Sequence, residues 1–411
     1  MNKIEGLKIR FKTDGFFVTL KTVLLNRINL RLDGWFQQIC NKVYCHKPLA
    51  DIIMIESHND FDCNGGPFYD YLIENHYNEK YKIVWLLKNK DTRELPKNVY
   101  AYRLHRPSWR KSQYMATAKF LLYDNVPVYK RRPTQKSMYL THGAFGLKDA
   151  HGVEAVGDIA DYLISPSANM DELCAYSWSL PYPTDKLVHL GFPSDNVFYR
   201  NLPNEYDKFI HKKYHKILLW LPTFRQLKNN LQRVESEAEY PYGLPLITSQ
   251  EDYTKLDSIL KKNDILLVIK LHPMQDLHVI EELDETENIK WLDALSVKKL
   301  GLDTYRLMRF SDALLSDYSA VAYSYLHRNR PIGYVLSDLQ DYKRGVCVDN
   351  PDDYMAGDKI FSMNDLYAFI DKLANNQDEY AQQRKALFDY MYAHHDDKSC
   401  ERIVEFLGIT K

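Results

Sequence analysis

The stretch that decides the fold is Leu314-Leu-Ser-Asp-Tyr-Ser-Ala-Val321, in which an apolar run leads directly into small polar residues. Two histidines upstream have the same setting: His142 follows the apolar run 137–140, and His272 follows 265–271. In a parallel α/β sheet, the residues that follow a strand lie at its carboxyl edge, where ligands bind. The three clusters therefore predict one site assembled from several strand ends.

Length and composition indicate a globular protein with two domains. The 411 residues exceed what a single core of ordinary size holds. The formal net charge of −1 gives no electrostatic reason to expect a nucleic-acid-binding protein. The six cysteines form no CxxC pair and no His/Cys spacing typical of zinc, so we expect no metal site. No run of about 18 apolar residues occurs, so we expect no transmembrane helix.

Residues 1–47 differ from the rest of the chain in their charge. They hold nine basic and three acidic residues, interleaved with apolar residues at helical spacing. Such a pattern is typical of a helix that lies on an anionic membrane surface. A helix packed on its own domain, with a solvated basic face, fits the pattern as well.

From residue 50 onward, short apolar runs alternate with amphipathic segments. This alternation predicts an α/β fold with parallel sheets and crossover helices. We expect helices at residues 67–77, 108–118 and 362–407. The predicted strands are 51–55, 82–87, 120–122, 138–140 and 162–164 in a first series, then 217–220, 265–269, 289–291, 313–315 and 331–335 in a second.

The two series of strands predict two doubly wound, Rossmann-like domains that face a central cleft. We assign residues 1–47 to a helical extension, 48–205 to the first domain and 206–385 to the second. A C-terminal helix at 386–411 could pack back on the first domain.

The second domain carries most of the candidate ligand-binding residues. Ser316 and Ser319 follow a strand and precede a predicted helix, so they could seat a phosphate, while Asp317 would cap that helix or bind a hydroxyl. His272 could stabilise a diphosphate leaving group, with Lys270 two residues earlier. In isolation, an ordinary N-cap without a ligand and a histidine that caps a strand end are the alternative explanations of these residues.

Two further positions follow the first strand of the second domain. Thr223 and Arg225 could both reach a phosphate, and arginine can do so with two hydrogen bonds. A surface arginine is the plain alternative.

The first domain offers a candidate general base. His142 precedes Gly143, which allows a ligand to approach the backbone closely, and its imidazole suits proton abstraction from an alcohol. A structural histidine is the alternative. We expect further residues on the same side of the site, toward an acceptor: Glu56, Ser57, Asn64, Gly143 and Lys148.

Taken in order, these motifs resemble the CDP-glycerol glycerophosphotransferases of teichoic acid and capsule synthesis, the TagF/TagB-like group. The resemblance covers residues 50–360. It rests on an ordered set: Glu56-Ser57 with Asn64 downstream, Thr141-His-Gly143, Asp161-Tyr-Leu-Ile-Ser-Pro-Ser167, Gly191-Phe-Pro193, Pro222-Thr-Phe-Arg225, Leu271-His-Pro273, Ser316-Asp-Tyr-Ser319 and Tyr342-Lys-Arg-Gly345.

The resemblance implies a GT-B fold, with the nucleotide in the second domain and the acceptor approaching from the first. It implies that His142 is the general base and that these residues surround the CDP diphosphate: His272, Thr223, Arg225, Ser316 and Ser319. The chain departs from the family pattern in two places. Trp-His-Gly-Thr is replaced by Thr141-His-Gly-Ala144, and Asp-Tyr-Ser-Ser followed by Phe-Asp is replaced by a sequence with Ala320 and Tyr323-Ser324.

The predicted reaction transfers glycerol phosphate, or another alditol phosphate, from CDP-glycerol or CDP-ribitol to a hydroxyl of a cell-envelope polymer or a lipid-linked acceptor, and releases CMP. We expect it to need no cofactor or metal and to occur in the cytoplasm, at the inner face of the membrane. Two alternatives stay open: a GT-B glycosyltransferase that uses a nucleotide sugar, and a non-catalytic, membrane-associated binding partner.

Overall fold

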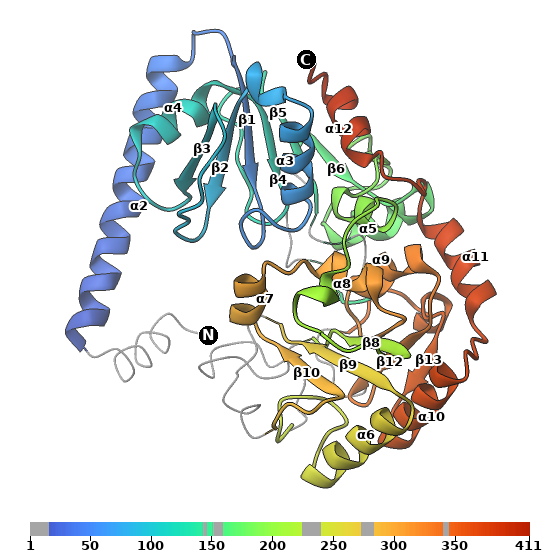
Figure 1. The fold of residues 1–411 in the computed structure, drawn as a ribbon. Coiled ribbons are helices and arrows are strands. Elements are labelled where there is room, and N and C mark those ends of the chain that lie inside the picture. The colour runs from blue at the N-terminus through green and yellow to red at the C-terminus, as the bar shows by residue number, and fades with distance from the viewer. Residues whose placement is uncertain are drawn as a thin grey trace. The chain divides into compact units, whose positions relative to one another are not determined.

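The chain divides into two compact units, each built on a parallel sheet. The computed structural model describes residues 16–141, 143, 146–149, 151, 159–223, 240–272, 283–339 and 345–411. Unit 1 comprises Met1–Gly143, His151–Asn196 and Asp396–Lys411, and unit 2 comprises Ala144–Ala150 and Val197–His395. Figure 1 shows the chain coloured from its N-terminus to its C-terminus.

Unit 1 holds a seven-stranded sheet in the order β3-β2-β1-β4-β5-β6-β7, and all neighbouring strands are parallel. Its strands are β1 Ala50–Glu56, β2 Lys82–Leu87, β3 Val99–Arg103, β4 Ala118–Tyr123, β5 Lys136–Tyr139, β6 Tyr162–Ile164 and β7 Leu187–Val188. Its α-helices are α2 Phe16–Tyr44, α3 Gly65–Glu74, α4 Trp109–Thr117, α5 Asp171–Ser177 and α12 Ser399–Leu407. Short 3-10 turns occur at η1 Tyr77–Glu79 and η2 Ala168–Met170.

Unit 2 holds a six-stranded parallel sheet in the order β10-β9-β8-β11-β12-β13. Its strands are β8 Lys216–Trp220, β9 Ile265–Lys270, β10 Ile289–Leu292, β11 Ala313–Ser316, β12 Ile332–Val335 and β13 Asp358–Ile360. Its α-helices are α6 Gln250–Lys262, α7 Ala294–Leu300, α8 Thr304–Phe310, α9 Val321–Ser324, α10 Met363–Ala374 and α11 Ala381–Met391. The 3-10 turns are η3 Pro193–Phe198, which begins in unit 1, then η4 Glu205–Lys208, η5 Tyr325–Arg328 and η7 Pro351–Tyr354.

Continuous apolar strands form the centre of each sheet, because helices cover both faces of a parallel sheet. In β9 the first five residues are fully buried, and in β11 all four are. The predicted α/β class and its two parallel sheets are confirmed, and each predicted strand coincides with an observed one. The predicted helix at 362–407 is three helices, α10, α11 and α12, and α12 belongs to unit 1.

A buried ion pair fixes α2 to α4 at the side of unit 1 (Figure 1). The Lys111 ammonium lies 2.9 Å from Asp33 Oδ1 and also donates to the backbone carbonyls of Arg103, Leu104 and Arg106. Burial lowers the pKa of Lys111, and the bond to Asp33 opposes that shift. None of the helices in the described parts of the chain combines the length and the hydropathy needed to cross a membrane.

Asp33→Ala should loosen α2 from unit 1, because it leaves the Lys111 ammonium buried without its carboxylate. Losing one partner of a buried pair costs about 3–5 kcal/mol. We therefore expect faster tryptic cleavage inside α2, at Arg27 and Arg31, measured by mass spectrometry of a limited digest. Asp51→Ala is the control, since it removes a pair with Lys119 that is 42% and 41% exposed and contributes about 0–1 kcal/mol. Equal cleavage of α2 in the two variants would contradict this account.

Candidate active site

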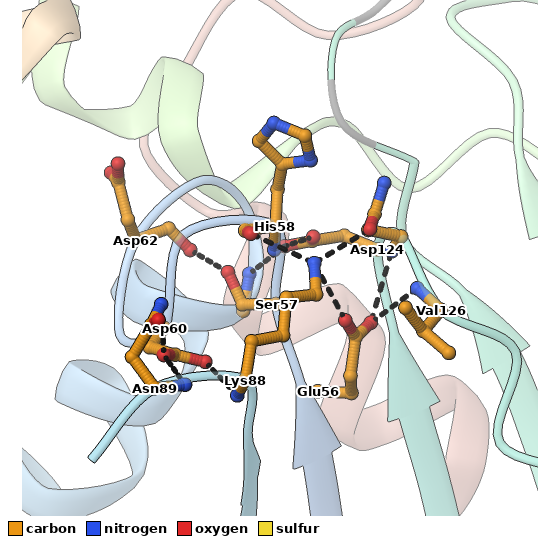
Figure 2. A network of polar contacts seen from close by, with 11 residues as sticks. Glu56, Ser57, His58, Asp60, Asp62, Lys88, Asn89, Asp124 and Val126 are labelled. Atoms are coloured by element: carbon orange, nitrogen blue, oxygen red, sulfur yellow. Dashed lines mark hydrogen bonds and ion pairs between the residues drawn. The ribbon is translucent and has the colours of Figure 1, made fainter. Parts of the chain in front are cut away.

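The carboxyl edge of the unit 1 sheet carries a buried polar network that joins three strand ends (Figure 2). Glu56, the last residue of β1, is fully buried. Its Oε2 accepts hydrogen bonds from the backbone N–H groups of Asn125 (3.1 Å) and Val126 (2.8 Å), and its Oε1 lies 3.1 Å from Lys88 Nζ. Burial raises the pKa of Glu56, and the Lys88 ammonium opposes that rise. Glu56 thus fixes the loop after β4 to the ends of β1 and β2.

Asp124 follows β4 and fixes the loop that begins α3. Its carboxylate accepts from the backbone N–H of His58 at 2.7 Å and from that of Gly65 at 2.9 Å. Burial raises the pKa of Asp124 well above its usual range, although both hydrogen bonds oppose the rise. Ser57 donates to the Asp62 carbonyl at 2.5 Å within the same loop. Asp124 was not among the predicted site residues, although an acidic residue two positions after the predicted strand 120–122 was the signal.

Asn64 fixes the segment that leads to His142. Its Nδ2 donates to the carbonyls of Leu140 (3.0 Å) and Thr141 (2.8 Å), and its Oδ1 accepts from both the N–H and the hydroxyl of Ser194. Thr141 has a positive φ of 60°, and its hydroxyl donates to the Gly143 carbonyl at 2.8 Å. Gly143 has a φ of 145°, which favours glycine. His142 itself lies outside the described residues, but both of its neighbours have defined positions.

The side chains predicted to face an acceptor therefore serve the protein's own framework. Glu56, Ser57 and Asn64 are each fully buried, and backbone or side-chain groups of unit 1 bind their polar atoms. Their observed contacts shape the loops at this edge of the sheet, so a direct contact with an acceptor stays a prediction.

A second polar cluster lies at the carboxyl edge of the unit 2 sheet. Asp317 follows β11 and is 2% exposed. Its Oδ2 accepts from the backbone N–H of Thr223 at 2.8 Å, and its Oδ1 accepts from the Thr223 hydroxyl at 2.6 Å. Lys148 Nζ in turn donates to Thr223 Oγ1 at 2.9 Å. Asp317 does not cap the following helix, since α9 begins only at Val321 and its N-cap is Ala320; that it binds a hydroxyl of the donor stays a prediction.

Lys148 requires a correction. Its predicted place in the first domain is wrong, because residues 146–149 belong to unit 2, while its predicted contact with an acceptor stays a prediction. The reason is a short bridge to Val346 and hydrogen bonds to its neighbours, which attach this segment to unit 2. Local sequence does not encode which unit such a loop joins.

The sheet order of unit 2 brings the other predicted donor-side residues together. Strand β8 lies between β9 and β11, so Lys270 at the end of β9, Thr223 after β8 and Ser316 at the end of β11 share one edge of the sheet. His272 follows β9 by two residues and is half-buried. The Ser316 hydroxyl is fully buried and has no hydrogen-bond partner among the described residues. Ser319 is half-buried in the turn before α9, and Arg225 lies outside the described residues.

Two Rossmann-like units with polar clusters at their carboxyl edges define a GT-B-type α/β protein. The solved structure of the wall teichoic acid polymerase TagF has the same fold: the TM-score is 0.68, the identity 18%, and the match covers 99% of this chain and 98% of that one. A putative UDP-N-acetylglucosamine 2-epimerase from Listeria monocytogenes matches less well, with a TM-score of 0.51, 12% identity and coverage of 87% and 95%.

The chain belongs to the family of CDP-glycerol:poly(glycerophosphate) glycerophosphotransferases, whose pattern matches residues 40–408. A teichoic acid poly(glycerol phosphate) polymerase of Bacillus spizizenii is 24% identical over 318 residues, which is 71% of this chain and 75% of the relative. A teichoic acid glycerol-phosphate primase of Bacillus subtilis is 24% identical over 329 residues, or 74% and 78%. The resemblance seen in the motifs and the transferase class that it implied are confirmed.

Asn64→Ala should lower kcat by about 10- to 100-fold and change the KM for the donor little. The variant frees the carbonyls of Leu140 and Thr141, and a shift of about 1 Å in a catalytic group can cost 100-fold in rate. Asn75→Ala, at the other end of α3, is the control, because its amide donates to the Tyr71 carbonyl of its own helix and accepts from the exposed Lys411, far from the segment that leads to His142. Steady-state kinetics would contradict the account if kcat were unchanged, or if only the donor KM rose.

Proposed function

We propose that this protein transfers an alditol phosphate, with glycerol phosphate as the first choice, from a CDP-linked donor to a hydroxyl group of a cell-envelope polymer or lipid-linked acceptor. The observation that carries the proposal is family membership over residues 40–408. Among the relatives, one is named a glycerol-phosphate primase and another a ribitol-phosphate primase. The donor could therefore carry glycerol or ribitol.

The donor diphosphate would bind at the carboxyl edge of the unit 2 sheet. Beside Thr223, the residues Lys270, His272 and Ser316 supply ammonium, imidazole and hydroxyl groups at this edge, which can donate hydrogen bonds to phosphate oxygens. Asp317 would not touch the phosphates, since it binds Thr223. Instead it holds the Thr223 hydroxyl in place.

In the proposed reaction, an acceptor hydroxyl oxygen attacks the β-phosphorus of the donor. A new P–O bond forms, the bond from the β-phosphorus to the bridging oxygen breaks, and CMP leaves with that oxygen. His142 takes the hydroxyl proton, and cationic and N–H groups of unit 2 offset the charge that develops on CMP. Phosphoryl transfer depends mainly on positioning and electrostatics. We expect these protein groups to suffice without a metal, so EDTA should leave the rate unchanged.

Purified protein should release CMP from CDP-glycerol or CDP-ribitol when a suitable acceptor is present, measured by chromatography of the nucleotides. His142→Ala should lower kcat by about 100- to 10,000-fold, because a general base contributes roughly that much. Release of UDP from a nucleotide sugar, with no use of either CDP-alditol, would favour a glycosyltransferase instead. Binding of CDP-glycerol without turnover would favour a non-catalytic partner, and full turnover by His142→Ala would remove the proposed base.

We propose further that α2 lies on an anionic membrane surface at the cytoplasmic face. Its C-terminal part packs on α4, where Phe36 contacts Trp109 edge to face. Its N-terminal part instead exposes large apolar side chains, among them Val18 at 59% and Leu24 at 58%. Lys21, Arg27 and Arg31 interleave with them. Apolar side chains together with lysine and arginine are the combination that binds anionic headgroups.

Vesicle sedimentation tests this membrane proposal. The full chain should pellet with vesicles of 30% anionic and 70% zwitterionic lipid, and a double variant, Leu24→Asp with Leu25→Asp, should stay in the supernatant. Each lysine or arginine near an anionic surface contributes about 1 kcal/mol to the free energy of binding. High salt screens these charges, so it should also weaken binding. Val43→Asp, whose side chain is 52% exposed at the other end of α2, is the control. Equal pelleting of the double variant and the full chain would contradict the proposal.

A further inference from the structure

The segment Gly146-Leu-Lys-Asp149, here called the strap, is built into unit 2 although the residues before Ala144 and after Ala150 belong to unit 1. Leu147 is fully buried, and its carbonyl accepts from the Cys347 N–H at 2.9 Å. The Asp149 N–H donates to the Gly345 carbonyl at 3.2 Å. Backbone hydrogen bonds therefore hold the strap on both sides of Lys148.

The strap also lies against the turn that follows β11. A Cβ atom added at Gly146 would come within 3.2 Å of the Ala320 backbone nitrogen and within 3.5 Å of its Cα. That turn contains Asp317 and Ser319, two of the predicted donor-side residues. Hence the close approach of Gly146 places the strap beside the predicted phosphate seat.

Lys148 extends from the strap to the carboxyl edge of the sheet. The Thr223 hydroxyl donates its hydrogen to Asp317, so its oxygen is the acceptor for the Lys148 ammonium. This chain of hydrogen bonds orients both the lysine and the threonine. An ammonium carries three N–H donors, so it can bind Thr223 and an anionic ligand at the same time.

The surroundings of this ammonium suit a phosphate. Thr223 and Asp317 are 6% and 2% exposed, and a charge in such a partly desolvated setting attracts an anion more strongly than one in bulk water. The fully buried Ser316 hydroxyl, which has no partner among the described residues, precedes Asp317 directly. Strand ends of this kind are where doubly wound sheets bind nucleotides.

We propose that Lys148 is a donor-binding residue whose ammonium contacts the diphosphate oxygens of the CDP-linked donor. The inference rests on the proposed function, and it assigns Lys148 to the nucleotide of the donor instead of to the acceptor. Only five positions separate Lys148 from Gly143 in the chain. The strap thus connects the donor site covalently to the loop of the proposed base.

A purely structural role makes a different prediction for Lys148. If the lysine only supported Thr223 through its hydrogen bond, a neutral side chain that can still donate to Thr223 would preserve nucleotide affinity. If it binds the diphosphate, the positive charge itself is needed. Glutamine and arginine separate the two roles, since glutamine keeps a donor without charge and arginine keeps the charge.

The experiment measures the Kd for CDP by titration calorimetry on the full chain and on Lys148→Arg, Lys148→Gln and Lys148→Met. A hydrogen bond to a charged group is worth about 10- to 100-fold in affinity, so we expect losses of that size in the Gln and Met variants and a smaller loss in Lys148→Arg. Cytidine, which lacks phosphates, should bind all four proteins equally by saturation-transfer NMR. Lys385→Met, at a lysine on α11 that is 69% exposed, should bind CDP as the unaltered chain does.

Unchanged CDP affinity in Lys148→Gln would overturn this assignment, whether or not the affinity of Lys148→Met is also unchanged. Loss of cytidine binding along with CDP binding would point to a structural role and would also overturn it. CMP release by the unaltered chain is measured separately. Turnover combined with unchanged CDP affinity in the variants would refute only the role of Lys148, whereas a chain that neither binds CDP nor turns over CDP-alditols would refute the proposed function as well.

Discussion

A buried carboxylate at the carboxyl edge of each sheet holds the loops from which the site is built. Parallel strands end at a common edge and leave backbone N–H groups there that need acceptors. In unit 1, Asp124 accepts from the N–H groups of His58 and Gly65, and in unit 2, Asp317 accepts from the N–H and the hydroxyl of Thr223. Without these acceptors the loops would carry unsatisfied polar groups in the interior, at about 1–3 kcal/mol each.

The two carboxylates occupy equivalent places in the two sheets. Asp124 directly follows β4, which neighbours β1, and Asp317 directly follows β11, which neighbours β8. In each case the carboxylate binds the loop after that neighbouring strand. A lysine also stands at or just after the next strand along: Lys88 after β2 and Lys270 at the end of β9. A buried carboxylate that accepts from backbone N–H groups thus fixes the loop before α3 in unit 1 and Thr223 in unit 2.

The central strands could be predicted from the sequence because they are continuous apolar runs, as in β9 and β11. Three outer strands were missed for identifiable reasons. β3 is an edge strand with several half-exposed residues, and β7 and β13 have only two and three residues, too few for any periodicity. The same apolar runs also show where each strand ends. The polar residues that follow these ends supplied most of the candidate site. The partners of those residues could not be predicted, since the contact of Lys148 with Thr223 depends on which unit the strap joins.

We propose above all that the nucleotide diphosphate binds at the carboxyl edge of β8, β9 and β11. A crystal structure of the full chain soaked with CDP tests it most directly. We expect density for both phosphates beside Thr223, within hydrogen-bond distance of donor groups at these strand ends, with the turn after β11 next to them. Density for CDP at the carboxyl edge of the unit 1 sheet, next to Glu56 and Asp124, would contradict it.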